Sequence, residues 1–228
     1  MPQVDYEKRE DGIHLIRLGS EYGGYWVPDN MGYDIVYDCG VGEDTSFAED
    51  LYTRYCGSEI HLFDPTEKAI KHLESIDKYN KERWHTWFTH YIGISDINEI
   101  KKFYPPQNPE HASYSAENIQ HTDMPVSFQC YNLKTIMDIL NHKYIDLLKL
   151  DIEGSEYAVI ASLRNFNIKP QVIVVEFHAL DHSGSIIKYA AEWLEKNYVL
   201  LKIEDNNHTY LEKKEYDRRC ISHQGEKL

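Results

Sequence analysis

Two carboxylates and two glycines in this chain have the spacing of a nucleotide-binding corner. A hydrophobic run ends in Asp38 and is followed by Gly40 and Gly42, just before a polar helix start. Glycine lacks the Cβ that would block close approach, so backbone N–H groups and a helix N-terminus can reach a ligand there. Asp64 follows Gly42 by 22 residues, a separation typical of a carboxylate that binds ribose hydroxyls. The spacing therefore predicts a nucleotide-like cofactor.

The class of cofactor depends on the position where a dinucleotide fingerprint carries its third glycine or alanine. That position holds Thr45, which disfavours a pyrophosphate and with it NAD. Asp38 suits a cofactor that carries a cationic amino group and a sulfonium. The hydroxyls of Thr45 and Ser46, at the helix start, could hold its carboxylate. These features favour S-adenosylmethionine, and a tight strand-to-helix turn without a ligand is the structural alternative.

A second group of polar residues follows two later strand patterns. Asp151 and Glu153 come directly after one of them, and Glu176 and His178 end the next. Residues two apart on a strand point to the same side, so Glu176 and His178 are expected to face one crevice. His178 is the candidate general base for methyl transfer to a hydroxyl, because an ordinary imidazole pKa of about 6.5 allows proton uptake near neutrality. A hydrogen-bonded structural histidine is the simpler alternative.

The same residues allow a second chemistry, based on a metal ion. Asp151, Glu176 and His178 could bind a divalent cation that orients an acceptor hydroxyl and lowers its pKa. Base and metal both remain open from the sequence. Glu153 and Glu156 also fit a simpler role as carboxylates that stabilise the N-terminus of the following helix.

Alternating strand and helix patterns would position these groups. Apolar residues recur three and four apart in the expected helices, and continuous β-branched runs mark the expected strands. The expected order is strand 35–38, helix 44–55, strand 59–63, helix 67–80, a strand and turn within 84–96, strand 126–131, helix 133–141, strand 144–150, helix 155–166, strand 171–178 and helix 185–198. This alternation predicts an α/β fold with a doubly wound, mostly parallel seven-stranded sheet that binds ligands at the carboxyl ends of its strands.

The two ends of the chain depart from this alternation. Residues 198–203 and 208–211 are joined by so short a connection that they predict an antiparallel C-terminal hairpin, and a polar tail is expected after Tyr216. We expect one domain over residues 1–228, with an N-terminal strand-and-loop extension at 1–32. In that extension, the aromatic stretch Tyr22–Trp26 predicts either a hairpin at the sheet edge or a loop folded over the cofactor corner.

Residues 100–125 contain four prolines and little periodicity, which predicts an irregular loop. Such a loop is either a substrate loop or lid, or a surface excursion. Its aromatic and imidazole side chains could line an acceptor pocket: Tyr104, His111, Tyr114 and His121.

Composition narrows the partners and the compartment. The formal net charge is −14, with 24 Lys and Arg against 38 Asp and Glu, which argues against a nucleic-acid surface and favours a small-molecule substrate. The four cysteines form no C-x-x-C pair, the polar and charged residues 1–9 predict no signal peptide, and no apolar run reaches about 18 residues. We therefore expect a cytoplasmic protein with no membrane partner, and the sequence does not indicate an oligomeric state.

Four segments resemble the FkbM family of class I S-adenosylmethionine-dependent methyltransferases. They are residues 36–42, 61–65, 145–156 and 174–178, and the block Lys-Leu-Asp-Ile-Glu-Gly-Ser-Glu at 149–156 is the most specific. The resemblance spans about residues 33 to 180 and implies a Rossmann-like fold. It also implies O-methylation of a sugar, a nucleotide-linked sugar or another small polar metabolite. The residues expected at the methyl donor are Asp38, Gly40, Gly42, Thr45, Ser46, Asp64, Ile94 and Asp151, with Asp64 in place of the family's more usual glutamate.

Two other functions are compatible with the same corner. A catalytically inactive scaffold would bind S-adenosylmethionine without transferring its methyl group. An NAD-dependent oxidoreductase is disfavoured by Thr45. Titration with S-adenosylhomocysteine and a methyl-transfer assay would separate the three.

Overall fold

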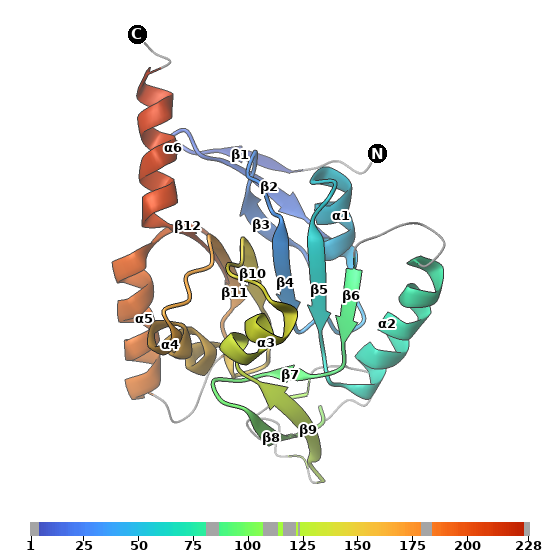
Figure 1. Ribbon diagram of the computed structural model, residues 1–228. Coiled ribbons are helices and arrows are strands. Elements are labelled where there is room, and N and C mark those ends of the chain that lie inside the picture. The colour runs from blue at the N-terminus through green and yellow to red at the C-terminus, as the bar shows by residue number, and fades with distance from the viewer. Residues whose placement is uncertain are drawn as a thin grey trace.

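The computed structural model describes residues 5–80, 87–106, 114–115, 122, 124–178 and 184–225 (Figure 1). Its main sheet is seven-stranded, with the order β12-β13-β11-β10-β4-β5-β6. The strands are β4 (Ile35–Cys39), β5 (Glu59–Phe63), β6 (Trp87–His90), β10 (Leu147–Leu150), β11 (Val172–Glu176), β12 (Tyr198–Glu204) and β13 (Asn207–Glu212). Strands β4, β5, β6, β10 and β11 are parallel, while β13 pairs antiparallel with both β11 and β12. The expectation of a doubly wound, mostly parallel seven-stranded sheet is therefore confirmed.

The order of the strands creates a switch point between β4 and β10. From β4 the chain moves outward to β5 and β6, and it later returns to β10 on the other side of β4. The crevice at the carboxyl ends of two such strands is where open α/β sheets bind ligands. Asp38 and Asp151 belong to these two strand ends.

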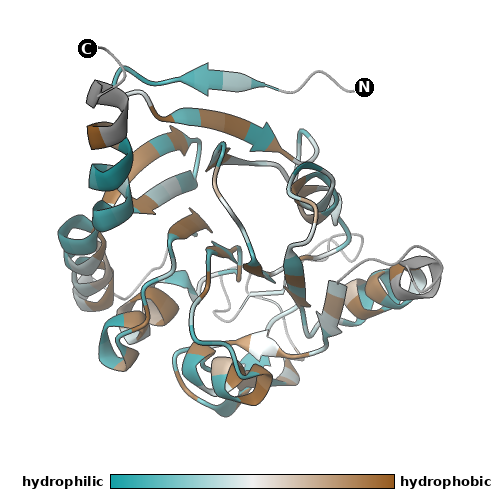
Figure 2. Ribbon diagram, turned by 45° about the horizontal axis from the view of Figure 1, so that its top comes forward, coloured by the Kyte–Doolittle hydropathy of each residue, from teal (hydrophilic) through white to brown (hydrophobic). Residues whose placement is uncertain are grey.

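Helices cover both faces of the sheet because successive strand residues point to opposite sides. The helices are α1 (Ser46–Arg54), α2 (Glu67–Asn80), α3 (Leu133–Leu140), α4 (Glu156–Phe166), α5 (Gly184–Asn197) and α6 (Lys213–Gly225). Val36 and Ile60 belong to a core that includes α1, whereas Tyr37 and Leu148 belong to a second core that includes α3, α4 and α5. The helices carry both brown and teal residues in Figure 2, as expected when one face of a helix is buried.

Two smaller sheets flank the main one. β1 (Tyr6–Lys8), β2 (His14–Leu18) and β3 (Tyr25–Pro28) form an antiparallel sheet, and β7 (Gly93–Ile94) lies beside the antiparallel pair β8 (Glu99–Phe103) and β9 (Val126–Tyr131). The N-terminal sheet is fixed to the C-terminal strands, because Arg17 forms an ion pair with Glu204 at 3.0 Å and Thr209 donates to the Trp26 carbonyl. These contacts join β2 and β3 to β12 and β13.

Two sequence expectations are wrong. The residues expected to be a polar tail form α6, whose Tyr216 donates to Asp11 and whose Glu215 pairs with Arg218 and Arg219. Such i,i+3 and i,i+4 ion pairs stabilise a helix that has little apolar periodicity. The loop expected from Lys101 begins later, because β8 continues to Phe103 through its pairing with β9.

Most of the predicted loop, including His111 and His121, lies outside the described residues. Within the described parts of the chain, no helix combines the length and the apolar character needed to cross a membrane.

Candidate active site

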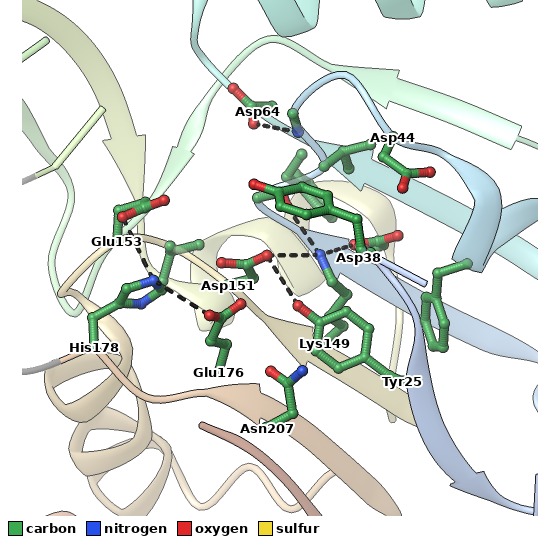
Figure 3. Close-up of a pocket in the computed structure, with 18 of the residues that line it drawn as sticks. Tyr25, Asp38, Asp44, Asp64, Lys149, Asp151, Glu153, Glu176, His178 and Asn207 are labelled. Carbon is green, nitrogen blue, oxygen red and sulfur yellow. Dashed lines mark hydrogen bonds and ion pairs between the residues drawn. The ribbon is translucent and has the colours of Figure 1, made fainter. Parts of the chain in front are cut away.

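A cavity of about 810 Å³ lies at the carboxyl ends of β4, β5, β10 and β11. It is lined by the glycine corner after β4, by the loop between β2 and β3, and by the turn between β12 and β13. The corner and the acidic groups after β10 and β11 therefore face one space (Figure 3), as the sequence predicts.

The two glycines of the corner serve different needs. Gly40 has φ +83°, and a Cβ at this position would lie 1.6 Å from the carbonyl oxygen of Asp151. Glycine is thus required by the neighbouring strand end, and not only by a ligand. Gly42 has φ +58° in open space, and its N–H donates to Asp64 at 2.9 Å.

Lys149 is a site residue that the sequence reasoning missed. Its Nζ donates to the Gly40 carbonyl at 2.9 Å and lies 3.0 Å from Asp38 Oδ1 and 3.7 Å from Asp151 Oδ2. Burial would lower the pKa of Lys149, but the two carboxylates raise it, so the side chain is cationic. A single lysine within Leu147–Leu150 was the available signal, since a buried cation requires a carboxylate partner.

The pairing with Lys149 changes how Asp38 is to be interpreted. The Asp38 side chain is 2% exposed and already forms an ion pair with Lys149. The sequence-based expectation was that its negative charge would pair with a cationic group of the cofactor. Asp38 lines the cavity, and a direct contact with a cofactor amino group stays a prediction.

The other predicted cofactor residues divide into two groups. Asp64 and Ile94 line the cavity, whereas Thr45 and Ser46 are not among its lining residues. The Thr45 hydroxyl donates to Glu49 at 3.0 Å, and Ser46 Oγ accepts from the Ser20 N–H at 2.7 Å. The structure therefore uses these two hydroxyls within the protein.

Asp64 is held at the end of β5 by three donors. Its Oδ2 accepts from the Gly42 N–H, and its Oδ1 accepts from both the N–H and the hydroxyl of Thr66. Burial nevertheless raises the pKa of Asp64. Hydrogen bonds within the protein thus orient the carboxylate, and its contact with a ribose stays a prediction.

The N-terminal aromatic stretch is both a hairpin and a cover for the corner. Tyr25 lies in β3 and donates its hydroxyl to Asp151 Oδ2 at 2.9 Å, while Tyr22 in the preceding turn lines the cavity. Ser20 anchors this turn by donating to Asp44 at 2.6 Å. The two interpretations of Tyr22–Trp26 are therefore compatible.

His178 lies at the centre of an acidic group. Its Nδ1 is 2.9 Å from Glu156 Oε1, and its Nε2 is 3.5 Å from Glu153 and 3.9 Å from Glu176 (Figure 3). Glu156 is fully buried and also accepts from the Ile152 N–H, so the interpretation of Glu156 as only a helix-start residue is too simple.

The charges around His178 overturn one premise of the general-base prediction. Burial would lower the pKa of His178, but the hydrogen bond and charge of Glu156, with the charges of Glu153 and Asp151, raise it to about 9. The imidazole is therefore protonated at neutral pH and cannot accept a proton in that state. The expectation of an ordinary pKa for His178 is wrong, because the sequence does not reveal that the Glu156 carboxylate lies beside the imidazole.

The metal prediction changes by one residue. Asp151, Glu153 and His178 each offer one ligand atom, and these atoms lie within 4.8 Å of one another. Glu153 thus takes the place of Glu176 in this group, although Glu176 Oε1 also lies 3.9 Å from His178 Nε2. Burial raises the pKa of Glu176, and the charge of Asp151 raises it further.

The cavity wall is strongly acidic. Among the described residues, ten carboxylates line it, against the two permanent cations Arg17 and Lys149. The carboxylates are Glu21, Asp38, Glu43, Asp44, Asp64, Asp151, Glu153, Glu176, Glu204 and Asp205. A wall of this sign attracts cationic ligands and repels phosphates.

Comparison with known proteins adds three findings. A family model described as the methyltransferase FkbM domain matches residues 33–210. Probable methyltransferase-like protein 24 of Homo sapiens is 26% identical over 174 residues, which cover 73% of this chain and 38% of the human protein. The chain thus spans well under half the length of this curated relative. The crystal structure of methyltransferase FkbM from Methylobacillus flagellatus KT has a similar fold, with a TM-score of 0.53, 14% identity, and coverage of 78% of this chain and 43% of that one.

Proposed function

Because the chain belongs to the methyltransferase FkbM family, we propose that it transfers a methyl group from S-adenosylmethionine to a hydroxyl of a sugar or another small polar metabolite. One observation supports this most strongly. The glycine corner after β4 and the polar groups after β10 and β11 line the same cavity of about 810 Å³, so one space can hold a methyl donor and an acceptor.

The cavity fits the proposed cofactor in charge and shape. Gly40 and Gly42 keep the corner free of side chains, Asp64 is oriented at the next strand end, and Ile94 adds an apolar contact surface. The acidic wall suits a ligand with a sulfonium and an amino group. When bound, S-adenosylmethionine supplies the electrophilic methyl group.

The negative charge of the cavity wall also limits the chemical class of the acceptor. Ten carboxylates would repel a diphosphate, so an unphosphorylated sugar or metabolite is favoured over the nucleotide-linked sugar that the sequence also allows.

The four cysteines are all free, which supports a reducing, cytoplasmic setting.

Glu176 is the proposed general base. It lines the cavity, and its raised pKa makes it a better proton acceptor than an ordinary carboxylate. Asp151, Glu153 and His178 would hold a divalent cation beside it. The cation would replace the Nε2 proton that the imidazole carries in the metal-free protein, while the Nδ1–H of His178 donates to buried Glu156. Such a carboxylate–histidine pair orients a metal-ligating imidazole, and a bound cation would lower the pKa of the acceptor hydroxyl.

The proposed function is tested first by calorimetric titration with S-adenosylhomocysteine and, in parallel, with NAD. We expect S-adenosylhomocysteine to bind and NAD not to bind. The reverse result would contradict the cofactor assignment and favour an oxidoreductase.

Activity is then measured as methyl transfer from labelled S-adenosylmethionine to a panel of free sugars, nucleotide-linked sugars and small polyols. Glu176→Gln should lower the rate by about 10²–10⁴-fold with cofactor affinity nearly unchanged. Glu74→Gln, the same chemical change on the exposed surface of α2, is the control. Cofactor binding without transfer to any acceptor would favour the inactive scaffold.

A further inference from the structure

A second cluster of metal-ligating side chains lies outside the cavity. Glu59 and His61 belong to β5, and His142 follows the C-terminus of α3. Glu59 is the first residue of β5, whereas Asp64 follows the opposite end of the same strand. None of the three residues lines the cavity, so the proposed methyl transfer does not account for this cluster.

We propose that Glu59, His61 and His142 form a binding site for a divalent transition-metal ion, with zinc as the best fit. The Nε2 atoms of His61 and His142 lie 2.9 and 3.0 Å from the same carboxylate oxygen, Glu59 Oε1. One ligand atom from each residue lies within 4.8 Å of the others. Ligand atoms around a tetrahedral zinc are about 3.3 Å apart, given bonds of about 2.0–2.1 Å, so each Nε2 would move away from Glu59 Oε1 by only a few tenths of an ångström.

The far ring nitrogens support the same assignment. His61 Nδ1 lies 2.8 Å from His90 Nε2, and His142 Nδ1 lies 2.8 Å from the Tyr37 hydroxyl. Metal-ligating histidines nearly always hydrogen-bond through the nitrogen that does not bind the metal, which fixes the tautomer and the ring orientation. Here both rings are held so that their Nε2 atoms converge on one point.

Metal binding at this site requires no net loss of protons from neutral rings. Without metal, the Nε2–H groups of His61 and His142 donate to Glu59. With metal, each Nε2 becomes a ligand and each proton moves to Nδ1, where His61 donates to His90 and His142 donates to Tyr37.

The three side chains differ in their exposure to solvent. The His61 side chain is 2% exposed, while those of His142 and Glu59 are 10% and 39% exposed. The partly exposed Glu59 carboxylate gives the site a path to solvent, from which water would supply a fourth ligand. Two imidazoles and one carboxylate with an open position form a known ligand set for zinc. The bound ion would join β5 to the end of α3.

The test uses the full chain without a polyhistidine tag and with His178→Ala, which removes the imidazole ligand of the cavity cluster. Calorimetric titration with ZnCl₂ should show one bound zinc. Zinc at about 100 times its Kd should raise the unfolding midpoint by about 5–10 °C. Absence of zinc binding in this variant would overturn the proposal.

Three further changes in the same background locate the ion. His142→Ala should abolish zinc binding. Glu59→Gln keeps an oxygen acceptor for both rings but removes the charged ligand, so it should weaken binding by more than about 100-fold while the metal-free fold stays intact. Tyr37→Phe removes only the hydroxyl partner of His142 and should weaken binding by about 10–100-fold. His14→Ala, on an exposed residue of β2, is the matched control, and equal zinc affinity in all variants would refute the assignment.

Discussion

The buried ion pair at the switch point gives the sharpest prediction about stability. We expect Lys149→Met to lower the free energy of unfolding by about 3–5 kcal/mol. At 3.0 Å, a unit-charge pair gains about 5–6 kcal/mol at an effective dielectric constant of 20, which roughly offsets the several kcal/mol that burial of each ion costs. Removing the lysine alone leaves Asp38 buried, 2% exposed and without its cation. Most of that desolvation cost then remains without compensation.

A second variant separates the loss of charge pairing from the loss of packing. Lys149→Met combined with Asp38→Asn leaves no buried charge in the pair and should recover most of the lost stability. The assay is urea unfolding followed by tryptophan fluorescence, with midpoints compared at constant slope. The single variant should also gain stability as the pH falls from 7 toward 4, because the raised pKa of Asp38 lets the folded state take up a proton first. A loss below about 1 kcal/mol, or a double variant no more stable than the single one, would refute the reasoning.

Three further predictions concern the cavity. Gly40→Ala should lower the free energy of unfolding, measured by thermal unfolding, by more than about 3 kcal/mol, since positive φ alone costs about 1–2 kcal/mol and the added Cβ would overlap the Asp151 carbonyl. Gly32→Ala is the control, because a Cβ there meets no atom within 4 Å, and it should lower the free energy of unfolding far less. Equal losses in the two variants would contradict this prediction. His178 should stabilise the fold by up to about 3 kcal/mol below pH 6.5, and this contribution should disappear as the pH rises through about 9; a pH profile that His178→Gln leaves unchanged would show that Glu156 does not hold the proton. Exhaustive chelation should abolish methyl transfer without preventing binding of S-adenosylhomocysteine, and full activity after chelation would exclude the cation.

The main sheet could be predicted from the sequence because its signals are local. Continuous β-branched runs such as Val172–Glu176 and helices with regular apolar spacing alternate along the chain. Helix α6 could not be predicted in this way, because ion pairs such as Arg218–Glu215 and its contact with Asp11 stabilise it in place of an apolar stripe. The contact with Asp11 joins residues far apart in the chain, and the local ion pairs leave no apolar periodicity to detect.

The candidate site was predictable in its residue types but not in its pairings. Asp151 and His178 follow recognisable strands, and the structure brings both to the cavity. That Lys149 neutralises Asp38 depends on the register that places the two residues opposite each other on β10 and β4. That Glu156 holds the Nδ1 proton of His178 depends on where the side chains point after the strand ends. Strand periodicity does not determine those directions beyond the last paired residue.

The N-terminal sheet has a consequence for how relatives of this chain can diverge. The family match begins at residue 33, yet Arg17, Tyr22 and Tyr25 line the cavity from outside that shared module. Exchange of the first 32 residues would therefore change one wall of the cavity. A chain trimmed to the family boundaries would lose this wall and also the hydrogen bonds of Ser20 and Tyr25 with Ser46 and Asp151, which hold the wall against the glycine corner.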